Sequence, residues 1–150
     1  MEIRIRRVGP NDAGLVAAMV AELLDDFSTD ATSDPAALTL TATAVLAMQT
    51  VTGLVAHEGE RPVGLVLLNE CAAIYAGGTF GEITELYVRP EMRSCGVAAL
   101  LLAEAERIGR TRGWRRIEVG APEQPKWSRT LAFYLREGFV EVGPRLKKPL

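Results

Sequence analysis

The stretch ELYVRPEMRSCGVAALLLAEAERIGRTRGW at residues 85–114 predicts a strand, a turn and a helix in succession. An apolar, strand-like run ends at Pro90, and a turn of small residues at 93–98 leads directly into the helix. The helix, predicted over residues 97–111, has apolar residues on one side and arginines toward its C-terminal end, where they suit the helix dipole. Gly113 is expected to end it.

The turn at residues 93–98 has features of a phosphate-binding site. The first turn of a helix leaves about four backbone N–H groups without partners and carries about half a positive charge. A phosphate can reach these groups only if the preceding residues are small. Gly96 meets this need, Ser94 and Ala98 nearly do, and Arg93 adds a mobile cation at the rim. Gly96 could equally do no more than permit a tight connection.

Two other phosphate-binding motifs do not fit this turn. A Walker loop ends in Gly-Lys-Ser/Thr, and the sequence has no lysine between residues 61 and 125. A dinucleotide fingerprint needs three glycines, and this turn contains only Gly96.

The remaining sequence predicts an α/β fold with a mixed sheet of about six to seven strands flanked by four helices. The two strands on either side of the helix at 97–111 should be parallel, because that helix connects them as a crossover. Residues 71–80, which include a Gly-Gly pair, read as a loop. The predicted strands are 2–8, 53–58, 62–70, 80–89, 115–120 and 139–143, with 145–150 as a further edge strand; the other helices begin near residues 15, 35 and 128.

Length, composition and charge exclude several classes of protein. The 150 residues predict one domain, 1–150, and 48% hydrophobic with 24% charged residues is ordinary globular usage. A net charge of −2 provides no global attraction for nucleic acid or an anionic membrane. Two cysteines and one histidine without ligand spacing predict no metal site. No stretch of 18 apolar residues occurs, so we expect a cytoplasmic protein without a membrane span.

Two motifs carry a resemblance to a known family. Val88-Arg89-Pro90 is followed by Arg93-Ser94-Cys95-Gly96-Val97-Ala98, and AFYLREGF at residues 132–139 ends a helix with a tyrosine, a charged segment and Gly-Phe. In this combination the chain resembles the GNAT superfamily of acyl-CoA-dependent N-acyltransferases. With the order of elements, the resemblance spans most of the chain and is weakest between residues 30 and 50.

The resemblance implies acetyl-CoA as cosubstrate, without a metal. The amides of the turn would bind the CoA pyrophosphate, and the end of the preceding strand would pair with the pantetheine arm like an added strand. Family members usually have glycine at the position of Ser94 and often at that of Ala98, so we expect weaker geometry without loss of the site. The residues implied are Leu86, Tyr87 and Val88 for the arm, whose side chains could instead be core, and Arg93, Ser94, Cys95, Gly96, Val97, Ala98 and Ala99 for the pyrophosphate.

Tyr134 matches the family tyrosine that can protonate the departing thiolate. A tyrosine with a pKa of about 10 is protonated at neutral pH and can donate to a thiolate with a pKa of about 8.5. Alternatively, Tyr134 is a core residue of a helix that also offers Leu131 and Leu135.

A general base must take a proton from the acceptor amine, which is cationic at neutral pH. The resemblance implies Glu82. Glu85 lies on the same strand with opposite parity, and only a β-bulge would turn both toward one cleft. Glu118 is a third possibility, and each of the three could simply be solvated.

The function implied is transfer of an acetyl group from acetyl-CoA to a primary amine, by direct attack in a ternary complex. The alternatives are a catalytically inactive acyl-CoA sensor and a nucleotide-binding module. The acceptor would be a small-molecule or peptide amine. The acidic residues Asp25, Asp26 and Asp30 could attract such a cation, and they could equally be a solvated helix end. Homodimerisation is possible.

Overall fold

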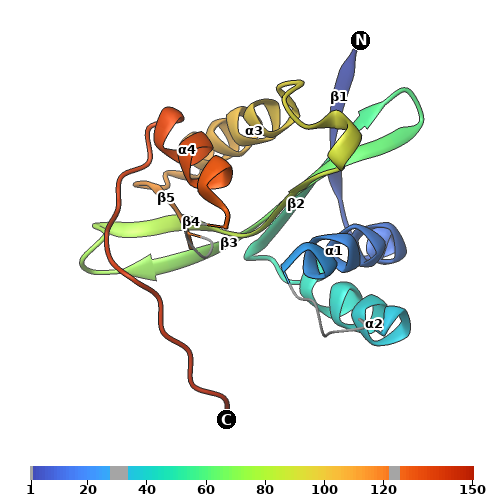
Figure 1. Ribbon diagram of the computed structural model, residues 1–150. Helices are drawn as coiled ribbons and strands as arrows, with labels where there is room; N and C mark the ends of the chain where they lie inside the picture. Colours follow the sequence, from blue (N-terminus) through green and yellow to red (C-terminus); the bar gives the residue numbers. More distant parts are fainter. Residues whose placement is uncertain (1, 28–33, 122–125) are drawn as a thin grey trace.

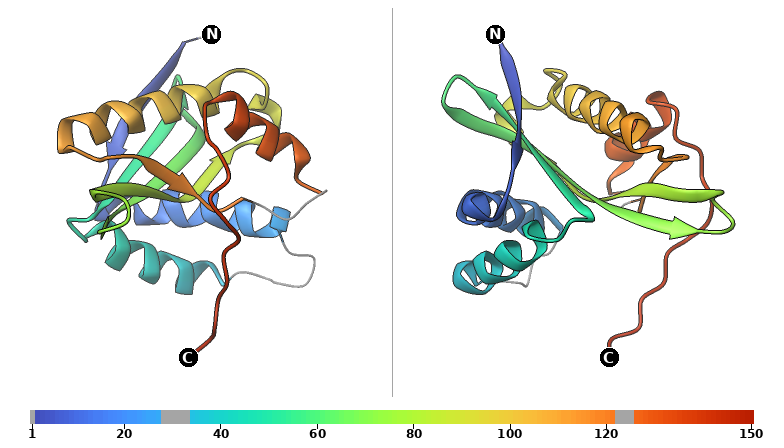
Figure 2. Two further views of the ribbon diagram at one scale, coloured as in Figure 1. Left: turned by 90° about the vertical axis from the view of Figure 1, so that its left-hand side faces the viewer. Right: turned by 180° about the vertical axis from the view of Figure 1, so that it is seen from behind.

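The computed structural model describes residues 2–27, 34–121 and 126–150 and has three layers (Figure 1). Helices α1 and α2 cover one face of a central sheet, and α3 and α4 cover the other (Figure 2). The elements are β1 (Ile3–Val8), α1 (Ala13–Phe27), α2 (Pro35–Leu46), β2 (Val51–Glu58), β3 (Arg61–Ala73), β4 (Gly78–Val88), α3 (Val97–Arg112), β5 (Ile117–Val119) and α4 (Ser128–Arg136), with 3-10 turns at Pro10–Asp12 and Pro90–Met92.

The sheet has the order β1-β2-β3-β4-β5. Its first four strands are antiparallel neighbours, and β4 and β5 are parallel. The parallel pair confirms the crossover predicted around α3. The predicted hairpin between β2 and β3 is also confirmed, with Gly59 at a φ of +59° in its turn.

The central strand β3 is buried on both faces, which explains its continuous apolar run. Val66 and Leu68 belong to the core cluster beneath α3, whereas Leu65 and Leu67 belong to the cluster beneath α1. Successive side chains of a strand point to opposite faces, so this one segment holds both helical layers on the sheet.

Trp114, just after α3, packs into space left by two glycines. A Cβ at Gly81 or at Gly109 would lie 2.3 Å or 2.6 Å from the indole ring. The indole N–H donates to Glu70 at 2.6 Å. This close approach fixes the C-terminal end of α3 against β4.

The predicted number of strands was wrong: the described residues form five strands, and none of residues 139–150 is in the sheet. Val140 and Val142 alternate as in a strand, but they are 79% and 72% exposed. Apolar alternation predicts only a tendency, and a strand also needs a neighbour with which to form hydrogen bonds.

The loop predicted at residues 71–80 was also too long. Cys71 pairs with Phe80 and Ala73 pairs with Gly78, so the hairpin extends to a turn at Ile74–Gly77. Of these strand ends only Phe80 is buried, and their pairing therefore leaves no regular apolar pattern in the sequence. None of the helices in the described segments is long and apolar enough to cross a lipid bilayer.

Candidate active site

The N-terminus of α3 leaves its first amides free. Gly96 is the N-cap residue at a φ of +82° and provides no side-chain cap. The first N–H bonded back to the cap is that of Leu100, which donates to the Gly96 carbonyl at 3.1 Å. Across residues 95–99, no N–H has a hydrogen-bond acceptor within the described parts of the chain. With Cys95 and Gly96 exposed, these amides are open to an anionic ligand.

Arg93 is held in place, in contrast to the mobile cation expected at the rim. Its Nε donates to the Val88 carbonyl at 2.9 Å, and its Nη2 donates to Asp26 at 2.9 Å. The guanidinium also lies 5.7 Å from the centre of the Tyr87 ring. Arg93 therefore connects the turn to the end of β4 and to α1.

The end of β4 has one free edge. β5 pairs with β4 only from Gly81 to Ile83, and no described strand follows along residues 84–88 on that side. The side chains of Leu86 and Val88 pack beneath α3, and that of Tyr87 packs beneath α1. These side chains are core, whereas the backbone edge can accept an extended ligand as an added strand.

A β-bulge in β4 turns Glu82 and Glu85 to the same face. Ile83 pairs with Leu68 and Glu85 pairs with Leu67, so Thr84 is the extra residue. Glu82 pairs with Asn69, which lies two positions from Leu67 and therefore on the same face. In the sequence, Glu82 and Glu85 fall on opposite faces of the strand unless a bulge lies between them. That bulge is present.

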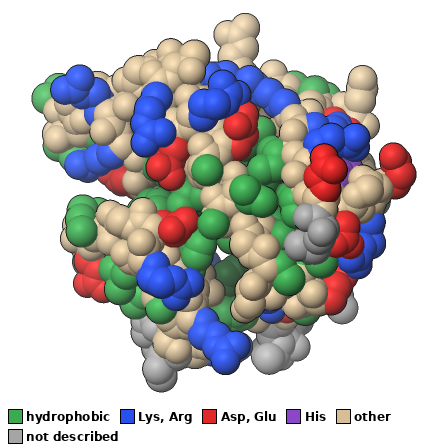
Figure 3. Space-filling model, turned by 90° about the horizontal axis from the view of Figure 1, so that it is seen from above, with side chains coloured by type: hydrophobic (Ala, Val, Ile, Leu, Met, Phe, Trp, Pro, Cys, Tyr) green, Lys and Arg blue, Asp and Glu red, His purple; other side chains and the backbone are tan. Residues whose placement is uncertain are grey.

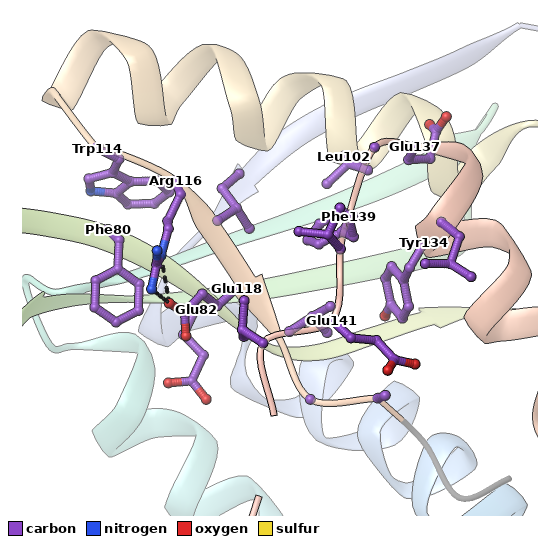
Figure 4. A pocket seen from close by; sticks show the side chains of 18 of the residues that line it. Phe80, Glu82, Leu102, Trp114, Arg116, Glu118, Tyr134, Glu137, Phe139 and Glu141 are labelled. Atoms are coloured by element: carbon purple, nitrogen blue, oxygen red, sulfur yellow. Dashed lines mark hydrogen bonds and ion pairs between the residues drawn. The ribbon is translucent and has the colours of Figure 1, made fainter. Parts of the chain in front are cut away.

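Glu82 lies in a cleft of about 1290 Å³ lined by parts of β4, β5, α3, α4 and the C-terminal segment (Figure 4). Glu118 is its register partner on β5. Each carboxylate has an arginine: Arg116 contacts Glu118 at 2.7 Å, and Arg145 contacts Glu82 at 2.7 Å. The outer face that bears α3 and α4 is hollowed and mixes basic with acidic side chains (Figure 3).

Tyr134 of α4 lines the same cleft and is 6% exposed. Its ring packs against Phe133 at 5.5 Å and against Phe139 at 5.3 Å between centroids. Burial raises the pKa of Tyr134 to about 12, so its phenol keeps its proton at neutral pH. Tyr134 is thus packed in a hydrophobic site, as in the core alternative, and also borders the cleft, so its role as the proton donor stays a prediction.

The chain matches the model of the acetyltransferase (GNAT) family over residues 17–139. It belongs to the GNAT family. A search of curated proteins gave no match.

Solved GNAT structures have the same fold. The chain is similar to a ribosomal-protein-alanine N-acetyltransferase from Brucella melitensis biovar Abortus 2308, with 19% identity, coverage of 100% of both chains and a TM-score of 0.79. It is also similar to the aminoglycoside acetyltransferase HMB0005 from an uncultured soil metagenomic sample, with 22% identity, coverage of 100% and 99%, and a TM-score of 0.81. A predicted acetyltransferase from Clostridium acetobutylicum, solved with acetyl-CoA, has 19% identity, coverage of 99% and 96%, and a TM-score of 0.80.

Two acidic residues of α1, Glu22 and Asp26, contact the end of β4 and the turn at residues 93–98. These contacts were not predicted from the sequence. The Tyr87 hydroxyl donates to Glu22 at 3.0 Å, and Arg89 donates to the same carboxylate at 3.4 Å. Burial, followed by the bond to Glu22, raises the pKa of Tyr87 to about 12. Glu22 and Asp26 are four positions apart, so they share one helix face, and this spacing was the available signal.

The acidic cluster at the end of α1 is only partly accounted for. Asp26 pairs with Arg93 instead of being free, and Asp30 lies outside the described residues. Phe27, the residue after Asp26, packs against Trp127 at 4.9 Å between ring centroids, which brings the end of α1 to the start of α4. Among the described residues, no cluster of three or more metal-ligating side chains occurs.

Proposed function

We propose that this GNAT protein is an acetyl-CoA-dependent N-acetyltransferase that acts on a primary amine by direct attack in a ternary complex. The observation that carries the proposal is the uncapped N-terminus of α3 beside the free edge of β4. The first feature suits a diphosphate, and the second suits an extended arm that ends in a thioester. The protein also has a cleft that is lined by the Glu82 carboxylate and the buried Tyr134 phenol.

In the proposed reaction, Glu82 accepts a proton from the acceptor amine, which frees the nitrogen lone pair for attack on the thioester carbonyl. The new C–N bond forms, the C–S bond breaks, and Tyr134 donates its proton to the departing sulfur; the second proton lost by the nitrogen, directly or through water, restores the Tyr134 phenol. Glu85, on the same face as Glu82, is the second candidate for the base. Glu118 is the third, and it is paired with Arg116 as Glu82 is with Arg145.

The acceptor is proposed to be a small-molecule or peptide amine. The similar structures include an enzyme named for a ribosomal-protein alanine and one named for aminoglycosides, which are acceptors of very different size. A screen of peptide N-termini, lysine, polyamines, amino acids and aminoglycosides, read out by release of CoA thiol, tests the proposal.

Tyr134→Phe is the decisive variant in that screen. Loss of the phenolic proton should lower kcat by about 100-fold, the low end of the range for general acid catalysis, while acetyl-CoA binding stays within about twofold. Tyr75→Phe removes an exposed phenol at the rim of the same cleft, on the β3–β4 turn, and should lower kcat by less than about twofold because this phenol has no part in the proposed proton transfers. Binding of acetyl-CoA without thiol release for any amine would instead support the sensor function.

A further inference from the structure

The C-terminal segment, residues 139–150, runs as an irregular chain that does not join the sheet (Figures 1 and 2). Its residues 139–145 line the cleft. The Phe139 N–H donates to the Tyr134 carbonyl at 3.0 Å. Beyond that bond, the described residues form no backbone hydrogen bond with this segment. The polar contact that holds it is an ion pair between Arg145 and Glu82, with Nη1 2.7 Å from Oε1.

Gly120, directly after β5, gives the Arg145 side chain its path to Glu82. A Cβ at Gly120 would lie 3.0 Å from Cδ and 3.1 Å from Nη1 of Arg145. A side chain at residue 120 would therefore crowd the guanidinium and displace it from its present position against the carboxylate. The contact thus involves Gly120 and Arg145 as well as Glu82.

The guanidinium occupies the place that an acceptor needs. Glu82 is the proposed base, and a protonated amine that donates to its Oε1 would fill the space that Arg145 Nη1 holds. We propose that Arg145 is a tethered competitor of the acceptor amine: it occupies the cation subsite at Glu82 until a cationic acceptor displaces it. This inference rests on the proposed function, and it specifies an acceptor that binds in its ammonium form.

The competitor is easily displaced. The Arg145 and Glu82 side chains are 68% and 24% exposed, and ion pairs between solvent-exposed groups contribute little. Phe139 packs against the core at the start of the segment, but the apolar residues beyond it do not anchor the chain near Arg145, since Leu146 and Leu150 are fully or almost fully exposed. Competition of this strength raises the apparent KM of the acceptor by up to about fivefold, without closing the site.

Steady-state kinetics test the competition with spermidine, a polycationic member of the screen, or with its fastest amine. Arg145→Ala should lower the KM for the amine by about two- to fivefold, with kcat changed by less than about twofold. Gly120→Val should act in the same direction although it leaves every charge in place. Lys147→Ala removes a cation from the same segment without touching Glu82 and should change neither value. A KM that rises or stays constant in Arg145→Ala overturns the proposal.

Limited trypsin digestion tests the contact without any acceptor. In Glu82→Gln the segment loses its ion pair, so cleavage after Arg145, seen by mass as release of residues 146–150, should be several-fold faster than in the unchanged chain. Glu118→Gln neutralises the neighbouring carboxylate and should have no such effect. Equal cleavage rates in all three proteins overturn the proposal. Faster cleavage in Glu82→Gln, without acetylation of any amine, shows that the contact exists but that the proposed function, and the competition with it, is wrong.

Discussion

Ser94 adopts a left-handed backbone conformation, with a φ of +65°, in the turn before α3. It is the one non-glycine residue with positive φ in the described part of the chain. This conformation costs a residue with a Cβ about 1–2 kcal/mol, which explains why GNAT sequences usually have glycine at this position. The serine keeps its N–H available, so the turn is strained but complete.

Ser94→Gly should raise the free energy of unfolding by about 0.5–1 kcal/mol. Relief of the left-handed strain exceeds the extra entropy that glycine gives the unfolded chain, which is about 0.4–1 kcal/mol. Urea denaturation measures the change, with Ser94→Ala as the control because alanine keeps the strain. A loss of stability in Ser94→Gly would contradict this explanation.

The sequence identified Arg93, Gly96 and Tyr134 by type and spacing. It did not predict that Arg93 would be bound to Val88 and Asp26, because a side chain with five donors is directed by whatever acceptors the folded chain brings near it.

At the scale of elements, α3 has a left-handed glycine at each end. Gly96 has a φ of +82° and Gly113 a φ of +79°, and a Cβ at either position would meet open space. The two glycines thus have the same conformational role. Only Gly96 faces the proposed diphosphate site.

Gly96→Ala and Gly113→Ala form a matched pair. Each should lower the free energy of unfolding by about 1 kcal/mol, because alanine is strained at positive φ. Only Gly96→Ala should weaken binding of CoA, by about tenfold, because its Cβ stands where a phosphate must approach the amides. Calorimetric titration with CoA measures the difference. Equal affinities in the two variants would mean that the turn does not bind the diphosphate.

The bulge at Thr84 arises from the pairing of β4 with β3. Within β4 alone, strict alternation places Glu82 and Glu85 on opposite faces. The pairing with β3 skips Thr84, and both glutamates then face the same side. The extra residue is defined by the hydrogen-bonding partner, so the strand's own sequence could not reveal it.

At the scale of the whole molecule, His57 makes the sheet sensitive to acid. Its side chain is 7% exposed, and its Nε2 accepts from Arg6 at 3.3 Å. Burial, followed by the positive charges of Arg6 and Arg4, lowers the pKa of His57. The fold therefore favours the neutral imidazole, with no role for His57 in the proposed chemistry.

The free energy of unfolding should decline as the pH falls below about 6.5. The unfolded chain takes up a proton on His57 near that value, whereas the folded chain does so only at a lower pH, so acid favours the unfolded state. Chemical denaturation at pH 7.5, 6.5 and 5.5 measures the decline, and His57→Gln should remove most of it. A decline of equal size in His57→Gln would assign it to other groups.

The sequence by itself determined the strand, turn and helix around Gly96, the helix boundaries at Pro35 and Gly113, and the two family motifs. Each of these depends on residues within a few positions of one another, where backbone geometry and capping act locally. Only the tertiary structure decided the number of strands, the bulge, the pairing of Arg93 with Asp26 across 67 positions, and the placement of Arg145 on Glu82. These features join segments that lie far apart along the chain, and no local pattern specifies which partner a free edge or a charged side chain will meet.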